Sequence, residues 1–276
     1  MKTILLITDH SPEAENAAMS ALMIAQAVGA NIVVADTVKN KQVTTKGFVT
    51  AGGLTEPGED LPMDMVTQLR EKVSAAGGYI PEITQIDISG LTINDLIIFI
   101  NHKKIWLLVE GMTNKPGCLL PDLKLNVQSV LDRVGCPLLL IPQSWQVKNF
   151  ERLVYLADLR YCRQFVLKFI GMLAAGFDAC ISIAHLSAKG LVDIVDNYAT
   201  EIFQTSVIPH THHGKISLNN ILERDLHKAA DVLINGMHND LMVLVNHRYH
   251  FEELIGRRIG EALPADITIP VLIFPL

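Results

Sequence analysis

The sequence contains one pattern twice, and this duplication constrains the fold more than any other feature. Three apolar, strand-like segments recur in the same order: residues 4–9, 31–38 and 105–109 in the first copy, and residues 153–158, 178–185 and 241–245 in the second. A pattern that returns in order along a chain indicates two copies of one folding unit. We therefore predict two similar domains, at residues 1–145 and 146–276.

Strand-like segments alternate with helical segments in both copies. Strands that are apolar along their whole length are typical of parallel sheets covered by helices on both faces. A fifth segment closes each copy, CPLLLIP at residues 136–142 and IPVLIFP at residues 269–275. We expect an α/β fold with two similar doubly wound, five-stranded parallel-sheet domains in tandem. The Gly- and Thr-rich residues 39–62 predict a long loop in the first copy.

The first helix of each copy carries start and stop signals. In the first copy, Ser11 and Pro12 predict the N-cap and the first helical position, and Gly29 predicts the end. In the second copy, Gly176 stands at the matching stop position, and Asp158 is a candidate for the cap. We therefore expect each helix to follow its first strand after a short turn.

Charge and apolar length exclude two classes of partner. The 276 residues include 23 Lys and Arg against 29 Asp and Glu, a net charge of −6, whereas duplex nucleic acid and anionic membranes favour clustered positive charge. No apolar run approaches the roughly 18 residues that a membrane-spanning helix needs. The four cysteines include no C-x-x-C pair, which predicts a reduced, cytoplasmic compartment. We expect neither nucleic acid nor a membrane as a partner.

With these segments in order, the chain resembles the universal stress protein family, in a tandem form with two copies of the domain. The resemblance rests on the Asp that ends each first strand, Asp9 and Asp158, on the capped helix after Asp9, and on the two Pro-bounded closing strands. It implies the Rossmann-like fold of the adenine nucleotide alpha hydrolase type and a stress-response function. It also implies fifth strands that pair across a dimer axis, so we expect a pseudo-dimer within the chain, with a homodimer as a further option.

The resemblance further implies an ATP-type nucleotide site at the carboxyl ends of the strands, where open parallel sheets bind ligands. ATP-binding members hold the phosphates with a Gly-x2-Gly-x9-Gly-Ser/Thr signature, because glycine lets backbone amides approach closely. In the first copy only Gly111 remains, and KLN at residues 124–126 stands where Gly-Ser is expected. In the second copy the matching text is NHRY at residues 246–249 and GRR at residues 256–258. The ATP motif is degenerate in both copies, so we expect no cofactor, with ATP or another nucleotide as the alternative.

The candidate ligand-binding residues occupy matching places in the two copies. They are Asp9, Val38, Gly111, Thr113 and Asn114 in the first copy, and Asp158, Asn246, His247, Arg248 and Arg257 in the second. Glu110 would repel a triphosphate, which favours a neutral or cationic ligand in the first copy. Helix capping is the alternative role for Asp9 and Asp158. Solvated positive charge is the alternative for Arg248 and Arg257.

Other reactive residue types do not assemble a catalytic pattern. The histidines at residues 210–213 invite a metal-site interpretation, but no adjacent cysteine or carboxylate completes a ligand set, so a polar loop is favoured. His247 and His250 follow a strand rather than lying in a helix, so their spacing is discounted in the same way. Residues 9–11 (DHS) have the residue types of a hydrolase triad, yet consecutive residues of one turn point in different directions.

The leading hypothesis is therefore a non-enzymatic protein of the universal stress type that senses a small molecule or serves as an interaction module. One alternative is an adenine-nucleotide-binding protein with slow ATP hydrolysis, which needs a metal or a base near the phosphates. Another alternative is a purely structural interaction scaffold, whose clefts are filled by side chains.

Overall fold

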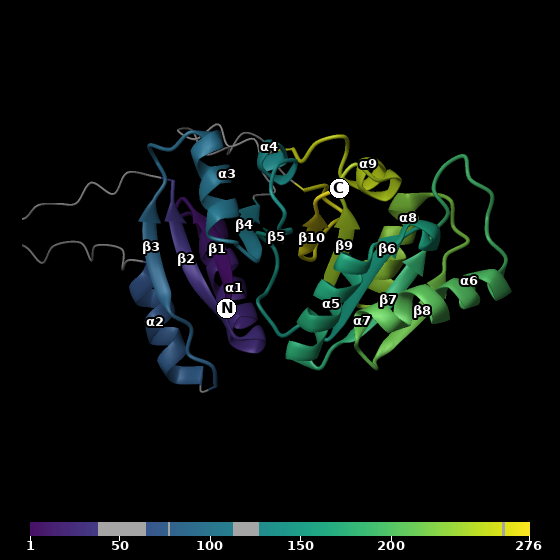
Figure 1. Ribbon diagram of the computed structural model, residues 1–276, viewed down its shortest axis with the longest axis horizontal. Coiled ribbons are helices and arrows are strands. Elements are labelled where there is room, and N and C mark those ends of the chain that lie inside the picture. Colours follow the sequence, from purple (N-terminus) through teal and green to yellow (C-terminus); the bar gives the residue numbers. More distant parts are fainter. Residues whose placement is uncertain (38–64, 77, 113–126, 261–262) are drawn as a thin grey trace, which may run out of the picture.

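The computed structural model describes residues 1–37, 65–76, 78–112, 127–260 and 263–276. Within these ranges ten strands form one sheet, in the order β3-β2-β1-β4-β5-β10-β9-β6-β7-β8 (Figure 1). The predicted α/β class with two similar five-stranded units is confirmed, and neighbouring strands within each unit are parallel. The predicted loop at residues 39–62 lies outside the described residues.

Each half of the chain repeats the same order of strands and helices. The first half contains β1 (Lys2–Thr8), α1 (Pro12–Val28), β2 (Ala30–Asp36), α2 (Met65–Ala76), β3 (Ile83–Asp87), α3 (Ile93–His102), β4 (Leu107–Met112), α4 (Val127–Leu131) and β5 (Leu138–Pro142). The second half contains β6 (Arg152–Ala157), a 3₁₀ turn (Leu159–Tyr161), α5 (Gln164–Phe177), β7 (Cys180–His185), α6 (Asp196–Ile202), a π-helical turn (Phe203–Val207), α7 (Ile208–Thr211), β8 (Ile216–Asn220), α8 (Leu226–Asp231), a second π-helical turn (Val232–Gly236), β9 (Leu241–Val245), α9 (Tyr249–Leu254) and β10 (Val271–Phe274). The duplicated sequence therefore gives a duplicated fold.

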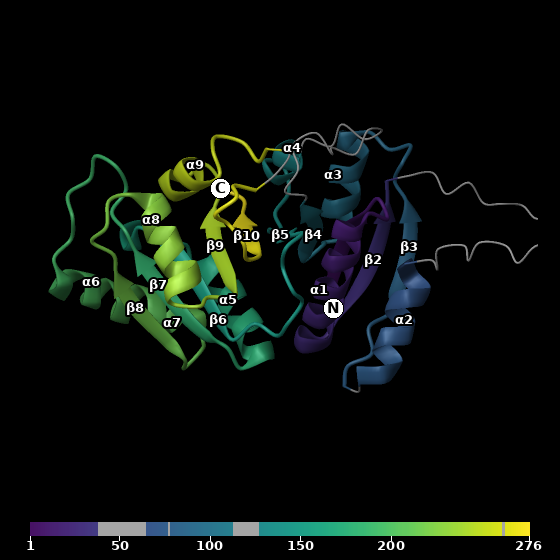
Figure 2. The ribbon, with the colours of Figure 1, turned by 180° about the vertical axis from the view of Figure 1, so that it is seen from behind.

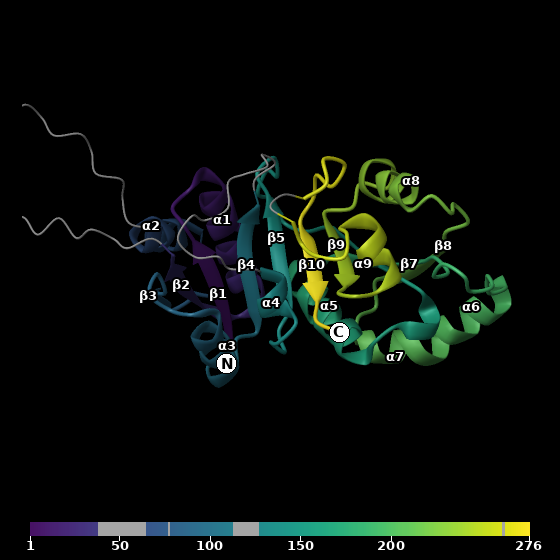
Figure 3. The ribbon, with the colours of Figure 1, turned by 90° about the horizontal axis from the view of Figure 1, so that it is seen from above.

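The two halves join where β5 and β10 lie side by side at the centre of the sheet (Figure 3). Residues 138–140 pair with residues 271–273 in the antiparallel sense, so the predicted pairing of the fifth strands within the chain is confirmed. The strands of the second half therefore run opposite to those of the first, and the carboxyl ends of the two halves lie at opposite edges of the sheet. A homodimer, and the domain boundary between residues 145 and 146, stay predictions.

Helices cover both faces of the sheet. On one face α1 contacts α2 and α5, and α5 contacts α7, whereas on the other face α3 contacts α4 and α8 contacts α9. Figure 2 shows the helices from behind. Most side chains of the central strands are buried because both faces are covered. No helix in the described ranges is long and apolar enough to span a membrane.

Helix α1 begins and ends where its sequence signals place it. The Oγ atom of Ser11 accepts a hydrogen bond from the backbone N of Ala14 at 3.2 Å, and Pro12 is the first helical residue. The helix ends at Gly29, whose φ of 66° lies in the left-handed region that side chains disfavour. The predicted start and stop are both confirmed.

The predicted stop at Gly176 is wrong. Helix α5 continues through Gly176 and ends at Asp178, which takes the left-handed backbone with a φ of 55°. Gly176 instead allows α5 to approach α1, because a Cβ built there would lie only 2.8 Å from the carbonyl oxygen of Ala27. The glycine serves the contact between the two halves rather than the end of a helix.

We expect Gly176→Ala to lower the free energy of unfolding by about 1–3 kcal/mol, because the added methyl group must push α5 away from α1. The sign is informative: without that contact, alanine in a helix interior would raise stability by about 1 kcal/mol. Urea unfolding measures the difference. Gly214→Ala is the control, since nothing lies within 4 Å of a Cβ built there. A more stable Gly176→Ala variant would contradict the close approach of the two helices.

Candidate functional site

The carboxyl ends of the first-half strands bring several titratable side chains together. β1 lies between β2 and β4, so Asp36 and Glu110 flank the turn that follows β1. In that turn His10 takes a left-handed backbone with a φ of 60°, and its Nε2 lies 3.2 Å from Oδ1 of the buried Asp36. The side-chain amide of Gln85 on β3 donates to Oδ2 of Asp36. Asp36 is thus held by polar partners from two neighbouring elements.

Glu110 has a buried carboxyl group at the same edge. Its Oε2 atom is buried and accepts no hydrogen bond from the described residues. Burial, and secondarily the neighbouring charge of Asp9, raises the pKa of Glu110 to about 7. Asp9 accepts a hydrogen bond from the backbone N of Ser11 at 3.0 Å and so closes the turn before α1. Among the described residues, Asp9, Asp36 and Glu110 therefore bring three carboxyl groups to the first-half edge.

Gly111 has a packing role at the same edge. A Cβ built on Gly111 would lie 2.3 Å from the carbonyl oxygen of Glu13, in the first turn of α1. The backbone of β4 and the start of α1 therefore touch at the place where the family signature has its first glycine. The other first-half candidates, Val38, Thr113 and Asn114, lie outside the described residues, as do residues 124–126.

The second half has a cavity of about 170 Å³ at the carboxyl ends of β6 and β9. Its lining includes Asp158, Tyr161, Ala188, His247, Arg248 and His250. Three residues predicted from sequence, Asp158, His247 and Arg248, thus meet at one cavity. The residues that the structure describes contain no group of three or more His, Cys, Asp or Glu placed to hold a metal ion.

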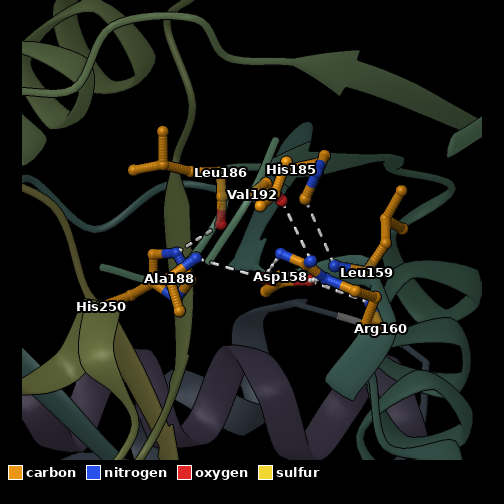
Figure 4. A network of polar contacts seen from close by, with 8 residues as sticks. All are labelled: Asp158, Leu159, Arg160, His185, Leu186, Ala188, Val192 and His250. Carbon is orange, nitrogen blue, oxygen red and sulfur yellow. Dashed lines mark hydrogen bonds and ion pairs between the residues drawn. The ribbon is translucent and has the colours of Figure 1, made fainter. Parts of the chain in front are cut away.

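Both carboxylate oxygens of Asp158 accept hydrogen bonds from neighbouring residues (Figure 4). Its Oδ1 accepts hydrogen bonds from the backbone N of Arg160 at 3.1 Å and from Nε of the same residue at 2.8 Å, and its Oδ2 accepts from Nη2 of Arg160 and from the backbone N of Ala188. Burial alone raises the pKa of Asp158, but these hydrogen bonds outweigh it and hold the pKa below its usual value. Asp158 caps the 3₁₀ turn rather than α5, so the expectation that it caps the helix is wrong.

Two buried histidines, His185 and His250, lie beside this network. Nδ1 of His185 accepts a hydrogen bond from the backbone N of Leu159 at 3.3 Å, and Nε2 of His250 lies 2.8 Å from the carbonyl oxygen of Leu186 (Figure 4). Burial lowers the pKa of both histidines, because an imidazolium loses its hydration there. Both rings are therefore neutral at pH 7. The proton of His250 is on Nε2, which donates a hydrogen bond to the carbonyl oxygen of Leu186.

Arg248 supplies the positive charge of the cavity. It precedes α9 at the N-cap position, and its guanidinium carbon lies 5.6 Å from the centroid of the Tyr161 ring. No carboxylate among the described residues forms an ion pair with Arg248, whereas the guanidinium of Arg160 is committed to Asp158. The cavity therefore carries one positive charge, that of Arg248, which no described carboxylate neutralises.

Asn246 and His247 contact the first half, and His247 does so while it also lines the cavity. The side chain of Asn246 donates to Asp132 at 2.8 Å and accepts from Gln128 of α4 at 3.0 Å. Nε2 of His247 lies 2.9 Å from the same oxygen of Asp132. These two candidates join the turn after β9 to the α4 segment, so they hold the two halves together at this point.

The remaining candidates do not converge on the cavity. Arg257 is exposed, and no hydrogen bond or ion pair joins it to the described residues. The histidine segment at residues 210–213 is a loop only in part, because residues 210 and 211 belong to α7 whereas residues 212 and 213 follow it. His210 and His213 each contact a backbone carbonyl oxygen, those of Ser206 and Ala179 respectively.

No protein-family model and no curated protein matches the sequence. Solved structures do match. A universal stress protein from Archaeoglobus fulgidus DSM 4304 is 14% identical, with a TM-score of 0.54 over 99% of this chain and 97% of that chain. A putative universal stress protein from Pseudomonas aeruginosa UCBPP-PA14 is 12% identical, with a TM-score of 0.56 over 99% and 93%.

The chain has the fold of a tandem universal stress protein. The resemblance noted in the sequence is confirmed at the level of the fold. The cytoplasmic domain of a prokaryotic cation chloride cotransporter has the same architecture, at 8% identity and a TM-score of 0.52 over 99% of this chain and 94% of that domain. The universal stress protein fold thus occurs in more than one functional setting, and the site must carry the argument about function.

Within this universal stress protein fold, sequence reasoning missed Arg160 and His185, and it discounted His250 as lying outside a helix, whereas His250 lies in α9. Arg160 follows Asp158 by two positions, the spacing at which an Asp side chain bonds the backbone ahead of it, and that spacing is a usable local signal. His185 ends β7, and His250 lies in α9, so nothing in the linear sequence indicates that they meet beside Asp158. Only the parallel pairing of β6 with β7 and β9 brings them together.

We expect Glu110→Gln to stabilise the protein at pH 8 by up to about 3 kcal/mol, because it removes a buried carboxylate whose pKa of about 7 lies above the ordinary 4.5. Ionised Glu110 destabilises the folded wild type fully above pH 7, and this cost disappears below the pKa of about 4.5 in the unfolded chain. The stability gained by Glu110→Gln should therefore shrink towards pH 5. Urea unfolding at the two pH values measures it. Glu71→Gln, on the exposed surface of α2, is the control, and an equal gain at both pH values would contradict the buried charge.

We expect His250→Gln to reduce the acid sensitivity of folding. Because burial lowers the pKa of His250 in the folded state, the unfolded chain binds an extra proton below about pH 6.5, and wild-type stability falls there. Glutamine can still donate to the carbonyl oxygen of Leu186 but does not titrate. The loss of stability between pH 7.5 and 5.5 should be smaller by about 1 kcal/mol than in the wild type.

Thermal unfolding of each protein across this pH range makes the comparison. The opposite trend of Glu110 is common to both proteins and cancels in the difference. His102→Gln, an exposed change on α3, should follow the wild type. A His250→Gln variant as acid-sensitive as the wild type would mean that the ring is protonated in the folded protein.

Proposed function

We propose that the chain is a tandem member of the universal stress protein family that acts without catalysis as a cytoplasmic sensor of a small anionic molecule. The binding site is the second-half cavity beside Arg248. The observation that carries this proposal is the contrast in charge between the two edges of the sheet. One edge of the sheet gathers carboxylates, and the opposite edge has a guanidinium without an acidic partner among the described residues.

The charges of the second-half cavity support an anionic ligand. Arg160 neutralises Asp158, and the buried histidines are uncharged, so Arg248 sets the local potential. The guanidinium of Arg248 lies over the ring of Tyr161, a contact that uses none of its N–H groups as hydrogen-bond donors. These N–H groups can therefore donate to a ligand. An arginine offers paired N–H groups that match carboxylate and phosphate oxygens.

The size of the cavity favours a ligand smaller than ATP. Its volume of about 170 Å³ is below the roughly 300–1,000 Å³ of pockets for drug-sized ligands. The turn at residues 246–249 (NHRY) also has side chains where the family's phosphate loop has glycine, and His247 itself takes a left-handed φ of 55°. We therefore propose inorganic phosphate or a small phosphorylated or carboxylated metabolite rather than a triphosphate.

A second candidate function, the interaction scaffold, is favoured by a specific observation. Asp158 and Gly111, two positions that the family uses for ligands, are both engaged by groups of this chain. If Arg248 also serves only to support α9, no ligand is needed. The two proposals differ in one measurable quantity, the affinity of the folded protein for small anions.

We expect isothermal titration to detect one binding site per chain for inorganic phosphate or AMP, and no tighter binding for ATP. Arg248→Gln should weaken that binding at least tenfold, because it removes the charge that attracts the anion. Lys168→Gln is the matched control, since it removes an exposed positive charge of the same half outside the cavity. Thermal unfolding of both variants verifies that they fold.

Three outcomes would overturn the proposal. If isothermal titration detects no binding of phosphate, AMP, ADP, ATP or cyclic AMP, the interaction scaffold is favoured. Binding that Arg248→Gln leaves unchanged would place the site elsewhere. Release of phosphate from ATP with magnesium, abolished in an Asp9→Ala, Asp158→Ala double variant, would establish the slow hydrolase instead.

A further inference from the structure

A second and larger cavity opens at the seam between the two halves. It has a volume of about 630 Å³ and lies where β4 and β5 begin and β10 ends. We call it the seam cavity. Its lining includes the side chains of Lys2, Lys104, Trp106, Phe165, Phe169 and Phe274. None of them lines the cavity beside Arg248. The volume falls within the range of small-molecule sites.

Aromatic rings from both halves form one wall of the seam cavity. Trp106 of the first half stacks on Phe169 of α5, with centroids 4.3 Å apart and an interplanar angle of 13°. Phe274 meets Phe169 edge to face at 5.2 Å and Phe165 at 5.7 Å. Trp106 is half-buried, and Phe165 is 43% exposed. The cluster therefore shows aromatic surface to the cavity instead of sealing it.

Positive charge lies around these rings. The ammonium of Lys2 is 5.7 Å from the centroid of the Trp106 ring and donates one hydrogen bond, to the carbonyl oxygen of Val28 at 2.9 Å. An ammonium group has three donors, so Lys2 keeps further donors for a ligand. Lys104 is exposed at the rim, and Arg163 lies over the Phe165 ring at 5.9 Å. No Asp or Glu among the described residues lines the cavity.

The opposite end of the same seam shows what a closed aromatic cluster looks like in this protein. There Trp145, Phe150 and Phe177 contact one another, with centroid distances of 6.5 and 5.2 Å. The segment between β5 and β6 carries Trp145 and Phe150 and covers that end, so Phe150 is fully buried and Trp145 is 8% exposed. The chain crosses between the halves once, and no described segment covers the Trp106 end in the same way.

We propose that the seam cavity binds a flat aromatic molecule that carries a negative charge, such as an aromatic carboxylate or sulfonate. The rings of Trp106 and Phe165 contact its flat surface, and Lys2 and Lys104 pair with its charge. Aromatic contact gives the affinity and the lysines select the anion. The site is formed by residues of both halves, so a ligand bound there stabilises their present arrangement.

Tryptophan fluorescence provides a direct test, because the chain has 2 tryptophans and Trp106 is the one that lines the cavity. Trp145→Phe leaves Trp106 as the sole emitter, and it removes an indole N–H that has no hydrogen-bond partner in the described structure. The probe is 8-anilinonaphthalene-1-sulfonate, and its neutral counterpart is N-phenyl-1-naphthylamine. We expect the sulfonate to bind at one site per chain, quench Trp106 by energy transfer, and bind at least tenfold tighter than the amine.

A Lys2→Gln, Lys104→Gln double variant should weaken the sulfonate at least tenfold and leave the amine unchanged. Lys72→Gln, an exposed change on α2, and Arg248→Gln, in the other cavity, should leave both probes unchanged. Equal affinity for the two probes, absence of Trp106 quenching, or an unaffected double variant would each overturn the proposal. Failure of the Arg248 site in titrations with phosphate has no bearing on this result, because the two sites share no residue.

Discussion

The antiparallel pairing of β5 with β10 is the interaction on which the rest of the structure depends. Three residues of each strand, 138–140 and 271–273, join two sheets of five strands into one. Because the pairing is antiparallel, the carboxyl ends of the two halves face opposite edges of the sheet. The candidate residues that follow β1 and those that follow β6 therefore lie at opposite edges of the sheet. The same pairing places α1 against α5, and the close approach at Gly176 follows from it.

The carboxyl ends of the strands carry different charged side chains in the two halves. In the first half, Asp9, Asp36 and Glu110 gather beside one another, and Glu110 is held at a pKa of about 7 by burial. In the second half the carboxylate of Asp158 is neutralised by Arg160, and Arg248 remains. A sheet of the same topology thus offers one edge unfavourable to anions and one favourable to them. In a shared architecture the residues of the site, rather than the fold, carry the function.

Much of the fold follows from local signals, and rather less of the site does. Ser11, Pro12 and Gly29 fix the ends of α1 through contacts within a few residues, so the sequence indicates them directly. Gly176 has the same residue type as Gly29 but a different role, because its neighbour Ala27 is remote in the chain. Candidate residues divide in the same way. Asp158 is held by Arg160, two residues further along the chain, whereas His185 and His250 come to lie near it only through the packing of β6, β7 and α9.

The sequence by itself determined the duplication, the α/β class and the ends of α1. These are properties of periodicity, of residue type and of short spacings, which act over a few neighbouring residues. Tertiary structure alone decided that Glu110 is buried beside Asp9, that Asn246 and His247 contact α4, and that Trp106 meets Phe169 at an open seam. The physical reason is that burial, pKa and cavity shape depend on segments more than 60 residues apart in the chain, whose distance is set only when both halves pack against one sheet.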